Sequence, residues 1–183
     1  MTRVPSIKRT VPLAAVADED ETGLIRGYAS LFERTDRAGD RIRRGAFARS
    51  LEERTAAGVR MLWQHDPGEP IGRWTVLRED ARGLYAEGQL ELGSRRGREA
   101  LALLRGGAID GLSIGFRTRR AQPLRDAARR LLTDIDLWEI SLVTFPMQDA
   151  ARVREVRGLA FDWAGCLREA ARRIARPGLA VGA

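Results

Sequence analysis

The chain has 183 residues, of which 44% are hydrophobic and 31% charged, so we expect a soluble globular protein with a core of its own. No apolar run approaches the ~18 residues that a membrane-spanning helix needs, and the N-terminal residues lack the apolar stretch of a signal peptide. One cysteine, Cys166, and one histidine, His65, exclude an internal disulfide and a Cys/His zinc site within one chain. We therefore expect a protein of a reducing cytoplasm that uses no metal and no cofactor.

The charge is strongly one-sided in residue type. The net charge is +7, and of the 32 basic residues all but Lys8 are arginine. Arginine is also in excess over acidic residues between 152 and 183. Two explanations stay open: the coding bias of a GC-rich genome with a solvated tail, and a basic segment that meets nucleic acid or an acidic partner.

The elements predicted along the chain are mostly strands. Alternating or continuous apolar residues predict extended segments at 4–16, 24–32, 41–44, 59–64, 71–77, 83–92, 112–116 and 131–145. Helical spacing predicts a short helix at 46–54 and a second helix that includes 99–104 and ends at the Gly106-Gly107 stop signal. Many short strands separated by turn signals predict a mainly β single domain with flanking helices, built as a closed or nearly closed barrel of about seven strands.

The C-terminal part differs from the rest. A basic helix is predicted from about Leu159 to Ala175, ended by Pro177-Gly178. Its apolar side is formed by Leu159, Trp163, Cys166, Leu167, Ala170 and Ile174, and its arginines lie apart from them. We accordingly divide the chain into a barrel domain at 1–157 and a basic helical tail at 158–183.

The stretch Gly111-Leu112-Ser113-Ile114-Gly115 matches G-x-S-x-G, the nucleophile elbow of α/β-hydrolases. That elbow needs a helix directly after the serine and a histidine later in the chain. Here a strand pattern follows, and the only histidine, His65, comes earlier. The match therefore does not indicate an α/β-hydrolase.

Ser113 is still a candidate nucleophile on another fold. A serine hydroxyl needs a base and a group that orients the base, and His65 is the only side chain whose ordinary pKa lies near neutrality. Glu139 stands in the apolar run "IDLWEISLVTF", where a buried carboxylate is costly unless an imidazole N–H pairs with it. A His65–Ser113–Glu139 triad is thus available. The alternatives are a turn histidine, a small strand serine and a solvent-facing glutamate.

Five stretches carry a resemblance to a known family. They are "GYASLFERTDRAGDRIRRGAF" (27–47), "LWQHDPGEPIGRW" (62–74), "GLYAEGQL" (83–90), "LLRGGAIDGLSIGF" (103–116) and "LWEISLVTFPM" (137–147). In this order and spacing they resemble the prohead maturation proteases of tailed phages, which are related to the herpesvirus assemblins. The similarity runs from about Ile25 to Val153.

The resemblance implies a seven-stranded, herpesvirus-protease-like barrel and a serine endopeptidase. "WQHDP" places the catalytic histidine at His65, "LSIGF" the nucleophile at Ser113, and "WEISLV" the third member at Glu139. Oxyanion donors are expected from the loop after Phe145, or from Arg152 or Arg117.

The resemblance also implies partners and a place of action. The expected substrates are the major capsid protein and a scaffold protein, inside the assembling procapsid in the cytoplasm of a bacterial host. A homodimer, as in the assemblins, is a further implication, and the tail either packs on the barrel or recruits the protein to the shell. Nucleic acid contact would be incidental, and no membrane is involved.

Two other functions remain compatible with the sequence. One is a non-catalytic basic barrel that binds capsid protein or nucleic acid during assembly. Against the nucleic acid version, only 6% of residues are aromatic, without the aromatic and basic interleaving of single-strand binders. The other is a chymotrypsin-like hydrolase whose acid lies between His65 and Ser113, although no acid in that interval sits in an apolar run as Glu139 does.

Overall fold

The computed structural model describes residues 23–124, 128–156 and 159–160. Within these ranges the chain forms two helices and nine strands, and the prediction of a mainly β single domain is confirmed. The helices are α1 (Ala48–Gly58) and α2 (Arg95–Arg105). The strands are β1 (Leu24–Leu31), β2 (Asp40–Ile42), β3 (Arg60–Trp63), β4 (Asp66–Glu79), β5 (Gly83–Leu90), β6 (Gly111–Pro123), β7 (Arg130–Val143), β8 (Val153–Val156) and β9 (Leu159–Ala160).

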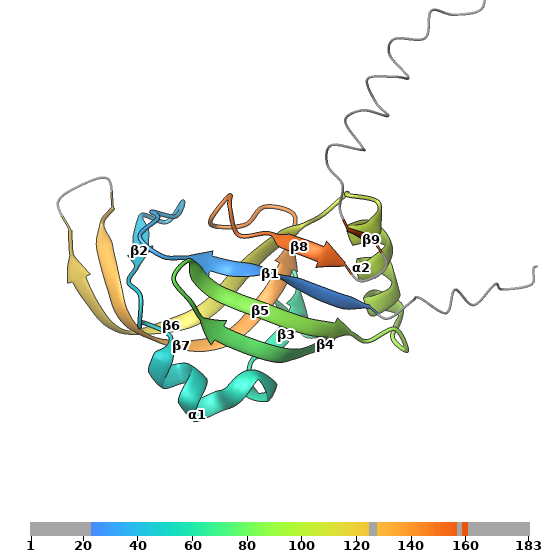
Figure 1. Ribbon diagram of the computed structural model, residues 1–183, viewed down its shortest axis with the longest axis horizontal. Coiled ribbons are helices and arrows are strands. Elements are labelled where there is room, and N and C mark those ends of the chain that lie inside the picture. Colours follow the sequence, from blue (N-terminus) through green and yellow to red (C-terminus); the bar gives the residue numbers. More distant parts are fainter. Residues whose placement is uncertain (1–22, 125–127, 157–158, 161–183) are drawn as a thin grey trace, which may run out of the picture.

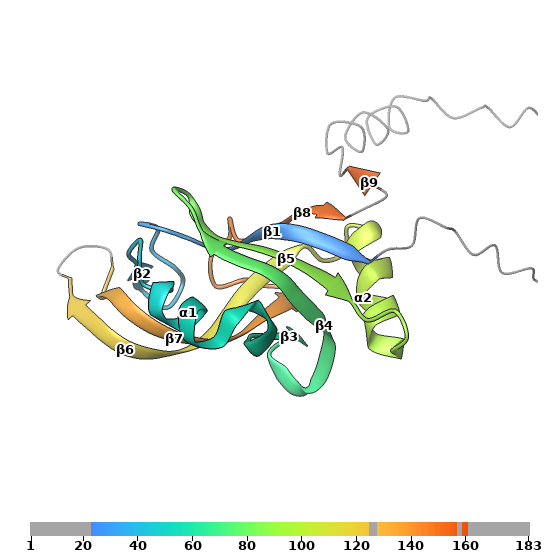
Figure 2. The ribbon, with the colours of Figure 1, turned by 60° about the horizontal axis from the view of Figure 1, so that its bottom comes forward.

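All nine strands belong to one curled sheet (Figures 1 and 2). Strand β7 is its hub: β6 pairs with it antiparallel on one side, and β2 and β3 pair with it in parallel. From β3 the sheet continues through β4, β5, β1 and β8 to β9. Strands β6 and β7 form a long curved hairpin that extends beyond the other strands (Figure 1).

The start of β6 and the residues just before β8 meet at one seam. Gly111 at the start of β6 forms a β-bridge with Arg152, just before β8. Main-chain bonds join Leu112 N to Ala151 O at 3.0 Å and Val153 N to Asp110 O at 2.8 Å. Seven strands, β6-β7-β3-β4-β5-β1-β8, thus form a nearly closed ring, in agreement with the predicted closed or nearly closed barrel of about seven strands.

The interior of the ring is apolar. Fully buried side chains come from nearly every element, among them Ile25, Phe47, Met61, Ile71, Leu84, Leu104, Leu112, Leu137 and Ile140. Leu112, Ile140 and Met61 lie on adjacent strands and face this core. The residues next to them in sequence on β6, β3 and β7 therefore lie on the opposite face of the sheet, because side chains alternate along a strand.

Helix α1 supports β7 from outside the ring. Leu137 N donates to the buried Ser50 hydroxyl at 2.8 Å. Arg54 donates two hydrogen bonds, 2.9 and 3.1 Å, to the Asp136 carboxylate. These bonds, followed by one from the Trp138 indole, lower the pKa of Asp136 to about 2. The helix thereby fixes the strand two residues before Glu139.

Several boundaries differ from the sequence expectations. Asp66-Pro67-Gly68 begins β4 instead of stopping a strand, since the chain reverses one residue earlier. Strand β8 was not expected. Leu159–Ala160 pairs with β8 as β9, so the prediction of a helix starting at Leu159 is wrong. The rest of that helix, the segment 4–16 and most of the tail lie outside the described residues. Neither described helix is long and apolar enough to cross a membrane.

Candidate active site

His65 occupies a two-residue turn between β3 and β4. Trp63 pairs with Asp66, which leaves Gln64 and His65 as the turn, with φ of 52° and 62°. Positive φ at both central residues is what a type I′ hairpin turn requires, and it is uncommon for residues other than glycine, asparagine and aspartate. The backbone therefore needs support from the surrounding structure.

That support comes from the end of β7. Gln64 N donates to Leu142 O at 2.9 Å, and His65 N donates to the Ser141 hydroxyl at 3.1 Å. The Gln64 side chain donates to Thr144 Oγ1 at 2.9 Å and accepts from Thr144 N at 3.3 Å. Four bonds thus hold the turn, and with it the imidazole, against one strand end.

Glu139 reaches the imidazole from β7. His65 Nδ1 lies 2.6 Å from Glu139 Oε1, and the Ser141 hydroxyl donates to Glu139 Oε2 at 2.6 Å. The Glu139 side chain is 12% exposed and that of His65 41%. Because Nδ1 faces a carboxylate, it carries the proton and leaves Nε2 free to accept one. The predicted pairing of Glu139 with the imidazole is confirmed.

The pair changes the titration of the histidine. The hydrogen bond that the imidazole donates to Glu139, together with the negative charge of that carboxylate, raises the pKa of His65 above its ordinary value, although partial burial opposes this. The acid required by the chymotrypsin-like alternative would have to come from between His65 and Ser113. Nδ1 is instead occupied by Glu139, so the structure contradicts that alternative.

Ser113 lies on β6, directly opposite Ser141 of β7, and Gly115 lies opposite Glu139. Directly opposed residues share a face of the sheet, as do residues two apart, so these four residues share a face of the sheet. Ser113 is 3% exposed, and its hydroxyl has no hydrogen-bond partner in the described chain. Catalytic hydrogen bonds are often long in the absence of substrate.

Gly115 has a steric reason to be glycine. A Cβ at this position would lie 2.1 Å from Glu139 Oε1. The missing side chain lets the glutamate extend over β6 toward His65. The last glycine of the G-x-S-x-G match thus belongs to the glutamate's site, and no nucleophile elbow is present.

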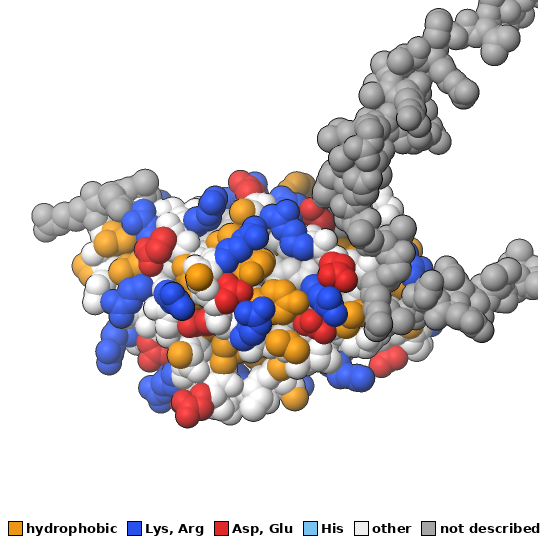
Figure 3. Space-filling view, viewed as in Figure 1, with side chains coloured by type: hydrophobic (Ala, Val, Ile, Leu, Met, Phe, Trp, Pro, Cys, Tyr) orange, Lys and Arg blue, Asp and Glu red, His pale blue; other side chains and the backbone are white. Residues whose placement is uncertain are grey.

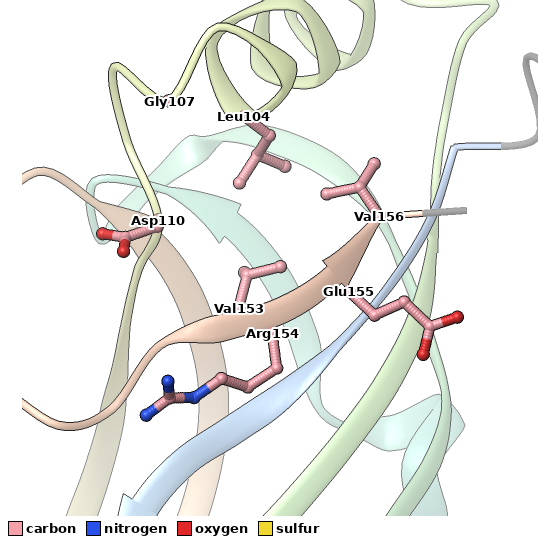
Figure 4. A pocket seen from close by; sticks show the side chains of 7 residues that line it. All are labelled: Leu104, Gly107, Asp110, Val153, Arg154, Glu155 and Val156. Carbon is pink, nitrogen blue, oxygen red and sulfur yellow. The ribbon is translucent and has the colours of Figure 1, made fainter. Parts of the chain in front are cut away.

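A small cavity lies beside Ser113. Its volume is about 20 Å³, and it is lined by Ala29, Ser30, Asp36, Ile42, Leu112, Ser113, Ile114, Met147 and Gln148. An open groove of about 380 Å³ adjoins it and shares Asp36, Met147 and Gln148. The groove is further lined by Arg34, Thr35, Arg37, Asp149 and Ala150. A third pocket, between α2 and β8, holds only about 10 Å³ and contains none of the predicted site residues (Figure 4).

The loop after β7 forms the wall between the cavity and the groove. Gln148 anchors it: its side chain accepts from Leu31 N at 2.7 Å and donates to Leu31 O and Arg34 O at 3.1 and 3.0 Å. The loop after Phe145 therefore lies beside Ser113, as expected for an oxyanion loop.

The two arginines expected as oxyanion donors lie differently. Arg152 donates to Asp149 O at 2.7 Å and forms an ion pair with Asp110, so its guanidinium is already bound. Arg117 is four residues beyond Ser113 on β6, roughly 13 Å away along an extended strand.

Sequence reasoning missed Ser141, Gln148 and Ser30. Ser141 carried a signal, since it stands two residues after Glu139 and therefore on the same face of the strand. Gln148 and Ser30 carried none, because Gln148 bonds to Leu31, more than a hundred residues earlier, and Ser30 meets Ser113 only through a cavity formed by distant strands.

A serine, an imidazole and a carboxylate on neighbouring segments of a curled sheet are the components that serine hydrolases use. Comparison with known proteins narrows this class. Residues 10–160 match the family model described as "Caudovirus prohead serine protease", and the chain belongs to this family.

Individual relatives agree. The chain is 34% identical over 143 residues to the prohead protease of Enterobacteria phage HK97, covering 77% of this chain and 63% of that protein. It is 29% identical over 138 residues to the prohead protease of Escherichia phage T5, covering 73% and 64%. The chain thus spans slightly under two thirds of these relatives' length.

A solved structure shares the fold. The capsid assembly protease gp21 of bacteriophage T4 superposes with a TM-score of 0.51 at 14% identity, over 66% of this chain and 81% of that chain.

Proposed function

We propose that this protein is a serine endopeptidase that cleaves capsid-protein or scaffold segments during maturation of a phage or phage-like prohead. The observation that carries the proposal is the Glu139–His65 hydrogen bond on the strand next to the buried Ser113, in a chain of the prohead protease family. No metal or cofactor takes part in the proposed reaction.

The mechanism uses each member of the triad once. His65 Nε2 takes the Ser113 proton while Oγ attacks the scissile carbonyl carbon, and the imidazolium then gives that proton to the leaving amine. Water hydrolyses the resulting acyl-enzyme by the same route in reverse. Glu139 holds the tautomer and stabilises the imidazolium, and Ser141 keeps the second carboxylate oxygen satisfied.

The loop after Phe145 supplies oxyanion donors in this proposal. Met147 and Gln148 line the cavity next to Ser113, and a preorganised donor at such a position is worth about 3–4 kcal/mol of transition-state stabilisation. The adjoining groove is large enough to receive side chains of the cleaved segment.

The proposed substrates are the major capsid protein and a scaffold protein, met inside the assembling procapsid in the bacterial cytoplasm. The names of the relatives support this: those from HK97 and T5 are prohead proteases, and the T4 neighbour is a capsid assembly protease.

The alternative, a non-catalytic basic barrel, is less well supported. On the face shown in Figure 3, basic and acidic side chains are interspersed. Many arginines of the described chain form ion pairs, as Arg26 does with Glu87. A binding barrel would also have no use for a histidine bonded to a carboxylate beside a buried serine.

The test is cleavage of the capsid protein and the scaffold protein that assemble into the same prohead. Ser113→Ala and His65→Ala should each lower the rate ~10³-fold or more, and the double variant should be little worse, because the two groups act as a unit. Thr133→Ala, which removes an exposed hydroxyl on β7, serves as the control and should cleave normally. Near-normal cleavage by Ser113→Ala would end the serine-protease proposal.

A further inference from the structure

Ser30 is a second buried serine beside Ser113. It lies on β1 at 2% exposure, next to a register irregularity between Tyr28 and Ser30. Its hydroxyl, like that of Ser113, has no hydrogen-bond partner in the described chain, and both residues line the cavity of about 20 Å³.

Other buried serines of the described chain are satisfied. Ser50 Oγ accepts from Leu137 N, and Ser141 Oγ bonds both Glu139 and His65 N. Leaving a buried hydroxyl without a partner is costly, and such a group in a native structure calls for an explanation. Here both unsatisfied hydroxyls line one cavity, which suggests that the cavity receives a polar atom.

The size of the cavity indicates which atom. About 20 Å³ exceeds the space of one water-sized probe, so one oxygen atom fits and an amino-acid side chain does not. When Ser113 Oγ attacks a carbonyl carbon, the carbonyl oxygen stays within about 3 Å of the attacking atom and becomes negatively charged. The cavity beside Ser113 is where that oxygen can lie.

We propose that Ser30 is a further catalytic residue of the protease, whose hydroxyl donates a hydrogen bond to the developing oxyanion. This role rests on the proposed function. Ser30 keeps its proton throughout, while the proton of Ser113 passes to His65. The donor is preorganised because nothing in the described chain competes for its hydrogen, and Gln148 fixes the main chain of the next residue, Leu31.

Ser30→Ala tests this role in the full-length protein with a capsid-protein peptide as substrate. We expect kcat to fall about 10²-fold with KM nearly unchanged, as for removal of one oxyanion donor. The melting temperature should stay the same or rise, because the variant removes an unsatisfied buried hydroxyl. A fluorophosphonate phosphonylates the serine and places its phosphoryl oxygen where the oxyanion would lie, so inactivation by it should slow in parallel.

Two further variants control for packing. Ser30→Cys keeps the shape and a weak donor, so its kcat should lie between those of the wild type and Ser30→Ala. Ser94→Ala, at the start of α2 and away from the site, removes a serine hydroxyl that has a partner in Gly97 N, and should lower the melting temperature without changing kcat.

The outcomes separate this role from the proposed function. If the wild type does not cleave, or if its cleavage persists in Ser113→Ala, the proposed function fails and the role of Ser30 fails with it. If the wild type cleaves and Ser113→Ala does not, but kcat of Ser30→Ala stays within two-fold of the wild type or only its KM rises, Ser30 merely lines a site for a water molecule. In that case the inference about Ser30 is overturned and the proposed function stands.

Discussion

At the scale of single residues, the site depends on side chains with unusual backbone or packing demands. His65 has a positive φ in a tight turn, and Gly115 leaves the space that the Glu139 carboxylate occupies. Such strained or close-packed positions persist where the surrounding structure stabilises them, often at functional sites. Here the stabilising contacts come from Ser141, Leu142 and Thr144 at the end of β7.

Glu139→Gln tests how the carboxylate acts. The amide can still accept the Nδ1–H bond but carries no charge, so we expect the rate of cleavage to fall ~10²-fold or more with the fold retained. His65 must be neutral to act as a base, and Glu139 raises its pKa. In the wild type, activity should therefore rise with pH through a value above the ordinary histidine pKa, and in Glu139→Gln this rise should move to lower pH.

The measurement is kcat/KM against pH, which reports groups of the free enzyme. The same pKa shift also makes the stability of the fold depend on pH. Because the folded pKa of His65 is raised, its pairing with Glu139 stabilises the fold most at pH below the ordinary histidine value, and this contribution is lost as pH rises through the folded pKa. An acidic limb that stays in place in Glu139→Gln would show that another group titrates.

At the scale of elements, the loop between β7 and β8 completes the site. Its residues Met147 and Gln148 separate the Ser113 cavity from the open groove. The Gln148 amide makes two hydrogen bonds to the main chain of Leu31 at the end of β1 and one to Arg34 O just after it. The loop is therefore positioned by a strand that lies more than a hundred residues earlier in the chain.

Gln148→Leu tests this anchor. The variant keeps the volume but leaves the buried main-chain groups of Leu31 without their side-chain partner, and the partly buried carbonyl of Arg34 likewise. We expect this to cost about 2 kcal/mol or more in the free energy of unfolding. Because the loop then loses its fixed position, kcat should also fall. Urea titration and peptide cleavage measure the two effects. Gln122→Leu, at an exposed glutamine of β6, is the control and should leave both the stability and kcat unchanged. A normal kcat in Gln148→Leu would show that the position of the loop does not affect catalysis.

At the scale of the whole molecule, the ring of strands is joined at one short seam. The Gly111–Arg152 bridge and the Asp110–Arg152 ion pair connect the start of β6, which carries Ser113, to the start of β8. Arg152 is thereby assigned to structure, and the predicted homodimer stays a prediction.

Arg152→Ala separates a structural role of the arginine at the seam from the expected role as an oxyanion donor. Losing the ion pair and the bond to Asp149 O should lower the free energy of unfolding by about 1 kcal/mol, as for a partly buried charged hydrogen-bond pair. The kcat for peptide cleavage should change much less than in Ser30→Ala. A large loss of kcat with unchanged stability would instead make Arg152 the oxyanion donor.

Much of this protein could be predicted from local sequence. Strand alternation in "GLSIGF" and "LWEISLV" predicted β6 and β7, and the Gly106-Gly107 signal predicted the end of α2. The short strand β8 was missed because four residues carry little periodicity. The two-residue turn at His65 was missed because Asp66-Pro67-Gly68 is the stronger turn signal, although the chain had already reversed.

The sequence by itself determined the family, through five motifs in a fixed order, and the mainly β class, through strand periodicity. It also predicted the three residues of the proposed triad, because each stands in one of these local motifs. The pairing of Glu139 with His65 followed from the cost of burying a carboxylate alone, and the structure contains it. Only the tertiary structure decided that Ser141 and Gln148 hold the site, that Arg152 is already bound, and that Ser30 shares a cavity with Ser113. These contacts join segments far apart in the chain, and no local pattern encodes which distant strands the closing of the sheet brings together.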